Sequence, residues 1–183
     1  AGCRQYVGYI TNTADHAIEI NYADAVQQEL TFCTPTHGTA PQAANEIATT
    51  DIALKALGVD AEIGATVPIE FQLRGQTYHF DMVVSGWWEA TNSSVSLMLV
   101  SHDFMNDNRA IFPNTYSSDK EIAGTFLSAV VLKSKTNVQE QLKEFARSAG
   151  GNPDDMSAPN FIQCTENGTE KAFLQPTTVA AVI

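Results

Sequence analysis

The chain has 183 residues, a hydrophobic fraction of 44% and a charged fraction of 17%, a composition that excludes intrinsic disorder and collagen-like or coiled-coil architectures. A chain of this length buries about 70% of its surface on folding, which is enough for one domain or two small intertwined ones. Ten Lys and Arg against 21 Asp and Glu give a net charge of −11. So acidic a chain is poorly suited to bind nucleic acid or an anionic membrane surface.

The first third of the chain alternates between apolar and polar residues in two places, at residues 6–10 and 17–22. In the second of these, Ile18, Ile20 and Tyr22 fall on one face, which predicts a β-strand. Residues 34–42 carry two prolines and a glycine. This composition predicts a loop.

A strand followed by a helix is predicted next. Residues 46–49 indicate a short strand, and residues 51–57 indicate a helix. Thr50 or Asp51 can cap the first turn of this helix, because their side-chain oxygens accept hydrogen bonds from free backbone N–H groups. Gly58 can end it, since glycine accepts the left-handed conformation that often follows a helix.

The middle of the chain predicts a β-hairpin. Residues 67–73 and 77–84 place apolar side chains at every second position, on either side of Arg74-Gly75-Gln76. Beyond the hairpin, the pattern predicts a strand at 95–100, a short helix at 102–107 and a polar loop at 108–120. A buried strand at 125–132 and a helix at 137–149 follow, and Thr136 or Asn137 can cap this helix. The last predicted element is an edge strand at 160–164. Strand–helix units near each end, with a hairpin between them, predict an α+β fold.

No motif in the sequence predicts a serine hydrolase. A nucleophile elbow needs the pattern GxSxG, and Ser85 is followed by Gly86 but has Val83 two positions before it. Ser101-His102-Asp103 contains the three residue types of a catalytic triad, but the side chains of consecutive residues diverge. We therefore interpret Ser101 as a helix cap.

Cysteine, histidine and acidic residues do not fall at the spacings of known metal or nucleophile sites. Cys33 with His37 or His79 could form a thiolate pair, but the loop around Cys33 gives this no support. Asn106-Asp107-Asn108 and Asp154-Asp155 lack the spacing of a calcium loop and are interpreted as polar turns. No glycine pattern suits a phosphate. We therefore expect no catalytic residues, no metal and no cofactor.

The pair Trp87-Trp88 is the feature best suited to binding a partner. Adjacent side chains on a strand point to opposite faces, so one ring should enter the core while the other can lie exposed beside residues 89–94. If one ring is exposed, Trp88 is the candidate contact with a peptide or a partner protein. The alternative is that both rings are buried, one in each of two packing layers.

The cysteines and the end of the sequence leave alternatives open. A bridge between Cys33 and Cys164 could form outside the cell, and free thiols are an equal alternative. Residues 178–183 turn apolar. They predict either a last buried strand or the approach to a membrane helix.

Four segments occur in an order and spacing typical of one family: Asn45-Glu46-Ile47-Ala48-Thr49, Ala53-Leu54-Lys55-Ala56-Leu57-Gly58, Ile63-Gly64-Ala65-Thr66-Val67, and the stretch from Tyr78 to Gly86. Together they resemble the extracytoplasmic core domain of FtsX-like permeases, whose best-known relatives are the MacB-like export permeases. Residues 125–133 with the helix after them resemble the family's second strand–helix unit. The loop at residues 106–124 matches nothing in that pattern, and the N-terminal part is short for it.

The resemblance implies a bacterial domain on the extracellular side of the cell membrane, between the first two membrane helices of an ABC transporter permease. It implies porter-like strand–helix units with an inserted, mostly-β hairpin subdomain, and no catalysis. The implied partners are the membrane helices of the same permease, a cytoplasmic ABC ATPase acting through those helices, and a peptide or lipoprotein. Both chain ends should then lie on one side of the molecule.

Two points stay open at this stage. Residues 1–183 form either a single extracytoplasmic domain or two intertwined subdomains, of residues 1–45 with 120–183 and of residues 46–119. The alternative function is that of a secreted binding module, or of a small hydrolase with an unrecognised active site.

Overall fold

The structure is a computed structural model of the whole chain, and it describes residues 2–13, 15–73, 75–90, 95–111, 126–129, 132 and 136–164. The chain divides into two compact units. The larger is Cys3–Leu127, and the smaller comprises Ala1–Gly2 and Ser128–Ile183. This division differs from the one predicted at residues 45 and 119, because strands on both sides of residue 45 pair within one sheet.

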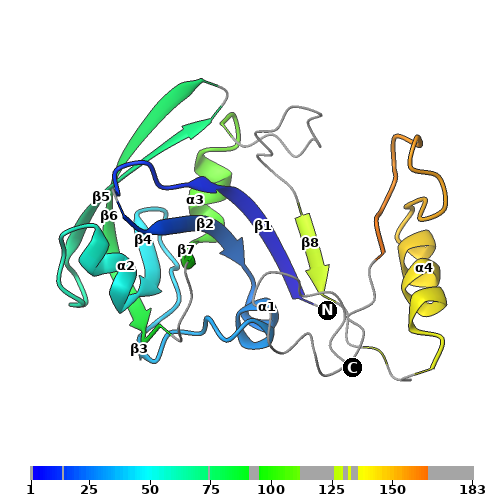
Figure 1. Cartoon of the computed structure of the whole chain (residues 1–183), viewed down its shortest axis with the longest axis horizontal. Coiled ribbons are helices and arrows are strands. Elements are labelled where there is room, and N and C mark those ends of the chain that lie inside the picture. Colours follow the sequence, from blue (N-terminus) through cyan, green and yellow to red (C-terminus); the bar gives the residue numbers. More distant parts are fainter. Residues whose placement is uncertain are drawn as a thin grey trace. The chain divides into compact units, whose positions relative to one another are not determined.

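The sheet is mixed and eight-stranded (Figure 1). Its strands are β1 (Gly2–Tyr9), β2 (Ala17–Ala23), β3 (His37–Gly38), β4 (Glu46–Thr50), β5 (Thr66–Leu73), β6 (Gln76–Trp88), β7 (Val95–Val100) and β8 (Phe126–Ala129). Their order is β3-β6-β4-β7-β2-β1-β8, and β5 pairs with β6 off this path. Strands β2 and β7 run parallel, as do β4 and β6, whereas β4 and β7 are antiparallel. With the helices described next, this sheet confirms the predicted α+β class.

The described residues form four helices: α1 (Ala25–Leu30), α2 (Asp51–Ala56) and α3 (His102–Asp107) belong to the larger unit, and α4 (Val138–Ser148) belongs to the smaller. The predicted helices at 51–57, 102–107 and 137–149 are confirmed to within a residue or two. Within the described part of the chain, no helix has the length and apolar character needed to cross a membrane.

The predicted hairpin is confirmed as β5 and β6, which pair from Thr66 with Val83 to Leu73 with Gln76. The apolar side chains of β5 are buried and the alternate ones are half-buried or exposed, as the period of two requires. Strand β6 continues well past the predicted end at residue 84. Its second half pairs with β4 and β3 instead of β5, so partners from elsewhere in the chain prolong it.

The N-caps of two short helices, α2 and α3, are residues that the sequence predicts for this role. The Thr50 side chain accepts a hydrogen bond of 3.1 Å from the Ala53 N–H at the start of α2, and Gly58 takes φ 77° after its end. At α3 the Ser101 side chain accepts from the Phe104 N–H at 2.9 Å. These bonds satisfy backbone donors that the first turn of a helix leaves free.

Helix α1 was not predicted. It begins after Asp24, whose side chain accepts from the Gln27 N–H, and it turns Gln27 and Gln28 inward. The chain then closes the helix with bonds from the Phe32 N–H to the Glu29 carbonyl and from the Cys33 N–H to the Gln28 carbonyl. This is the Schellman pattern, with Phe32 at the left-handed position where glycine is usual.

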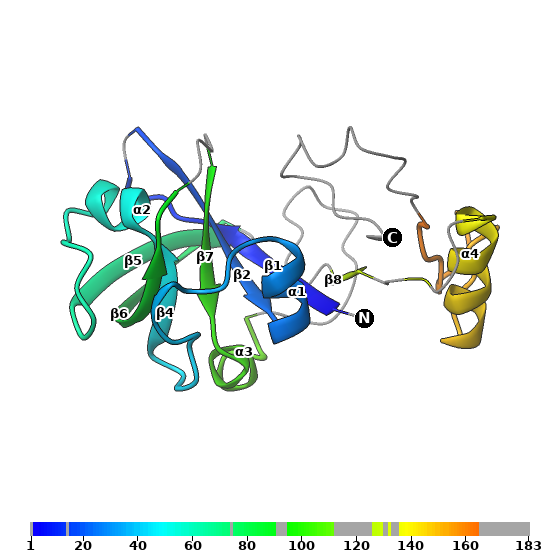
Figure 2. The ribbon, with the colours of Figure 1, turned by 90° about the horizontal axis from the view of Figure 1, so that it is seen from below.

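Two apolar clusters occupy opposite faces of the sheet. The larger is built on β1, β2, β4, β5, β6, β7, α2 and α3, and its largest buried side chains are Phe71, Phe104, Ile18, Ile20, Ile47 and Leu54. The smaller consists of Ala23, Cys33, Ala48, Trp88 and Leu99. Figure 2 shows α1 lying alongside β1 and β2, where the chain leads into this second cluster.

The smaller unit contains α4 and the loop after it. Val138, Leu142 and Ala146 are buried, and Gly150 takes φ 84° after the helix. Asn137 occupies the N-cap position but makes no side-chain cap hydrogen bond, because its own backbone is left-handed. The predicted edge strand at 160–164 is wrong, since this stretch forms only an isolated bridge between Asn152 and Phe161.

Several predictions fall on residues outside the described part of the chain. They concern most of the polar loop at 108–120, the ends of the strand at 125–132, the apolar end at 178–183 and the placement of Ile183 relative to the first strand. The three cysteines, Cys3, Cys33 and Cys164, are free thiols.

Candidate functional site

Trp88 does not meet the condition under which it was predicted to contact a partner. Its side chain is only 7% exposed and packs in the smaller cluster with Ala23, Cys33, Ala48 and Leu99. Trp87 packs against the edge of the larger cluster. The two rings therefore lie on opposite faces of the sheet, as the alternation of strand side chains requires. Trp88 is thus a core residue and not an exposed contact for a partner.

Trp87 is the more accessible ring of the pair, and it forms a stack with His37. The ring centroids are 3.8 Å apart with an interplanar angle of 11°. The two residues are cross-strand neighbours of β3 and β6, so they project from the same face. Sequence reasoning missed this contact because β3 is only two residues long and lies in a loop rich in proline and glycine.

Two glycines bring β3 close to β6. A Cβ atom on Gly38 would overlap the Ser85 carbonyl oxygen, and one on Gly86 would overlap the Thr39 carbonyl oxygen. Gly38 also has φ 73°, which glycine adopts at little cost. The hydrogen bond from the Thr39 N–H to the Ser85 carbonyl, at 2.9 Å, holds the strands together. The stack thus stands on a closely packed backbone.

The loop before β5 completes this surface. The Gly64 N–H donates to the Val84 carbonyl at 2.8 Å, and the Val84 N–H donates to the Ala65 carbonyl at 2.9 Å. These bonds place Ile63, which is 49% exposed, next to Gly38. We call His37, Ile63 and Trp87 the aromatic surface.

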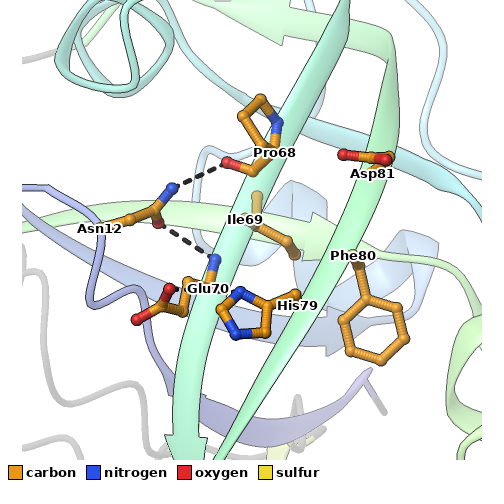
Figure 3. Close-up of a pocket in the computed structure, with 7 residues that line it drawn as sticks. All are labelled: Asn12, Pro68, Ile69, Glu70, His79, Phe80 and Asp81. Carbon is orange, nitrogen blue, oxygen red and sulfur yellow. Dashed lines mark hydrogen bonds and ion pairs between the residues drawn. The ribbon is translucent and has the colours of Figure 1, made fainter.

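A second candidate is a shallow pocket of about 290 Å³ on the outer face of the hairpin (Figure 3). It is lined by Asn12, Pro68, Ile69, Glu70, His79, Phe80 and Asp81. His79 Nδ1 lies 3.2 Å from a carboxylate oxygen of Glu70, its partner across the two strands. A pair this exposed contributes about 0–1 kcal/mol, so it does not by itself indicate a catalytic acid and base.

The hydrogen bonds that Asn12 makes in this pocket are structural. Its side-chain N–H₂ donates to the Pro68 carbonyl at 2.9 Å, and its side-chain oxygen accepts from the Glu70 N–H at 3.1 Å (Figure 3). The Thr11 N–H also donates to the Glu70 carbonyl. Residues 11 and 12 thereby satisfy backbone groups on the outer edge of β5, which is the usual way to blunt an exposed strand.

A partly buried ion pair links β1 and β2. Arg4 pairs with Glu19, and its Nε–H donates to the Asn21 side chain at 2.7 Å. Burial lowers the pKa of Arg4, and burial with the neighbouring Tyr9 raises the pKa of Tyr6 to about 12. The pairing across β1 and β2 compensates for desolvation of the charges, so we interpret this group as structural.

The candidate nucleophiles are not activated. The Cys33 side chain is only 2% exposed and lies 3.0 Å from the Thr31 hydroxyl. Burial raises the pKa of the Cys33 thiol, which disfavours the reactive thiolate. His37 stacks on Trp87 and His79 pairs with Glu70. Neither histidine therefore serves Cys33 as a base in this structure.

The residues considered for calcium make local contacts instead. The Asn106 side-chain oxygen accepts from Arg109 at 2.7 Å, and the Asn108 side chain donates to the Phe104 carbonyl. Asp154 is paired with Lys143 and Arg147. In the part of the chain that the structure describes, no group of three or more His, Cys, Asp and Glu side chains is placed to hold a metal ion.

Of the surfaces described, the aromatic surface is the one that combines accessible rings with a closely packed support. No known protein family and no curated protein matched this chain on comparison.

Proposed function

We propose that the chain is the extracytoplasmic domain of an FtsX-like ABC transporter permease. It serves transport without catalysis, either by recognising a substrate or partner or by mechanical coupling to the membrane helices. Its partners are those helices, a cytoplasmic ABC ATPase that acts through them, and a peptide or lipoprotein. The domain lies on the extracellular side of a bacterial cell membrane.

The observation that carries the proposal is that the segments of the resemblance form one connected unit. Strand β4, helix α2 and the β5–β6 hairpin follow one another, and β6 returns to run parallel beside β4. Three of the four segments thus contribute strands to one sheet, and the remaining one forms helix α2 between two of these strands.

Within this unit the matching residues have structural roles. The Glu46 carboxylate accepts hydrogen bonds from the Gln42 and Ala43 N–H groups at 2.7 and 3.0 Å. Gly58 and Gly64 take φ 77° and 88° at the two ends of the loop between α2 and β5. Side chains used in this way build a fold rather than a reaction centre, which supports a non-catalytic domain.

The native gene provides the decisive test. We expect one membrane helix before this segment and further ones after it, with an ABC ATPase encoded by the same gene or its neighbour. The full-length protein should co-purify with that ATPase in detergent. A native gene without a membrane helix on either side would overturn the proposal.

The alternative of a secreted module or small hydrolase gives a different result. A hydrolase would turn over generic ester, peptide or glycoside substrates, and its activity would survive in the isolated chain. The permease domain should show no turnover above a heat-denatured sample. Turnover that follows the folded protein through purification would favour the hydrolase.

A further inference from the structure

We propose that the aromatic surface of His37, Ile63 and Trp87 binds an extended polypeptide segment that carries positive charge. The inference concerns this surface alone and does not depend on the permease proposal, since a secreted binding module could use the same surface. It rests on the geometry of the stack, on the apolar residue beside it and on the charge around it.

The stack leaves one aromatic face free for a ligand. One face of the His37 ring lies against Trp87 at a centroid distance of 3.8 Å, and the His37 residue is exposed. The opposite face of the imidazole is therefore turned toward solvent. The Trp87 indole of the stack attracts the ammonium and guanidinium groups of Lys and Arg, and the flat rings also accept apolar side chains.

The surface is fixed before a ligand arrives. Gly38 and Gly86 allow backbone contacts that any Cβ atom would prevent, and the Thr36 N–H donates to the Trp87 carbonyl at 3.1 Å. A ring stacked on a second ring loses little further rotational freedom when it is contacted. Pre-organisation of this kind reduces the entropic cost of binding.

The segments that build the surface carry only negative charge. They are residues 35–39, 60–65 and 86–89, which contain Asp60, Glu62 and Glu89 and no Lys or Arg. The nearest basic residue along the chain is Lys55, in the last turn of α2. Because Asp60 and Glu62 are exposed in the loop that presents Ile63, a cationic partner gains from both charge and apolar contact.

An extended segment fits the shape and place of this surface. β3 is the outermost strand in the sheet order, so the surface borders a sheet edge. Ile63 lies against Gly38, the residue that follows His37, and presents an exposed aliphatic side chain. An extended chain with alternating basic and apolar residues can contact the aromatic rings and the aliphatic side chain at the same time.

The experiment uses the full chain and two fluorescent octapeptides, one of alternating Lys and Leu and one of alternating Glu and Leu. Binding is measured by fluorescence anisotropy. We expect the Lys-Leu peptide to bind and the Glu-Leu peptide not to bind. We also expect affinity to fall when salt is raised from about 0.05 M to about 0.5 M, because salt screens the attraction.

Variants locate the site. His37→Ala should weaken binding of the Lys-Leu peptide about two- to fivefold, because it removes one ring of the stack and the pre-organised surface that this ring provides. His37→Phe keeps a ring on Trp87 and should retain binding. Asp60→Asn combined with Glu62→Gln should weaken binding and reduce its salt dependence. The melting temperature of each variant confirms that it is folded.

A matched control sits on the hairpin. His79→Ala and Glu70→Gln remove the same residue types from another exposed surface of this acidic chain, and they should leave peptide affinity unchanged. The proposal is overturned if these controls weaken binding as much as the variants of the aromatic surface do, because the attraction is then non-specific. Absence of binding up to about 1 mM peptide, the weak limit for such contacts, also overturns it.

Discussion

Trp88 is a core residue, and its replacement should unfold much of the domain. Trp88→Ala removes a ring that packs with Cys33 and Leu99, so we expect the free energy of unfolding to fall by about 3–5 kcal/mol. Urea denaturation followed by circular dichroism measures this loss. Trp87→Ala is the matched control, because the Trp87 ring is only half-buried and its loss should be smaller. Equal losses would contradict the assignment of Trp88 to the core.

Phe32 carries backbone strain that no buried contact offsets. It has φ 55° and is 78% exposed, although it is a bulky residue at a position suited to glycine. A left-handed conformation costs an L-residue about 1–2 kcal/mol. Phe32→Gly should therefore raise the free energy of unfolding by about 1 kcal/mol, as measured by urea denaturation.

Phe32→Ala separates strain from side-chain effects. It removes the ring but keeps a Cβ atom, so the strain and the stability should stay close to the original. Were both substitutions to stabilise the domain equally, exposure of the ring rather than the backbone would be the cause. Because most of the ring contributes nothing to the core, its presence in a strained turn has no structural explanation.

The caps of α2 and α3 could be predicted residue by residue, whereas the His37–Trp87 stack could not. Thr50 and Ser101 act on N–H groups three residues away, so sequence spacing determines the contact. His37 and Trp87 meet across two strands that are far apart in the chain. Only the folded sheet brings such residues together, and no local pattern signals it.

At the scale of elements, α4 and its following loop are joined by an ion-paired aspartate. Asp154 receives hydrogen bonds from Arg147 at 2.7 and 3.2 Å, and Lys143 lies 3.2 Å away. The Arg147 hydrogen bond, followed by the Lys143 one, lowers the pKa of Asp154 below its ordinary value of 3.8. Arg147→Gln should raise that pKa, which carbon-detected NMR titration of the carboxyl group measures.

The sign of the pH effect follows from the direction of this shift. A carboxyl whose pKa is lowered in the folded state contributes stability above its unfolded pKa, and this contribution is lost as the pH falls through the folded pKa. Asp155 provides the control, because its pKa is lowered by Ser157. If Arg147→Gln moved the titration of Asp155 as much as that of Asp154, a general change in the loop would be the explanation.

Long periodic elements were predicted well, and elements shaped by tertiary contacts were not. The β5–β6 hairpin and α4 follow from alternation and helical spacing. Helix α1 was missed because it has six residues and turns two glutamines inward, against the usual polarity of a buried face. The predicted strand at 160–164 failed because Phe161 has a single bridge partner, and one bridge does not make a strand.

At the scale of the whole molecule, the pairing of β2 explains why the first part of the chain belongs to the larger unit. It pairs with β7 in parallel from Ala17 with Val95 to Tyr22 with Val100, although the two residues of each pair are 78 positions apart in the chain. Ile18 and Ile20 then join the larger cluster together with residues of β5 and β6. The hydrophobic pattern of each strand could be predicted from the sequence, but their pairing partners could not, because many strands share the same period.

The larger unit should therefore fold by itself, whereas its second half should not. Residues 3–127 contain both apolar clusters of the sheet. We expect a fragment of residues 1–127 to unfold cooperatively in urea and to keep the fluorescence of a buried Trp88. A fragment of residues 46–127 lacks β1 and β2, so β7 keeps β4 but loses β2 as a partner, and the larger cluster loses Ile18 and Ile20. It should show no cooperative transition. Cooperative unfolding of the shorter fragment would instead favour the alternative considered from the sequence, in which residues 46–119 form one of two intertwined subdomains.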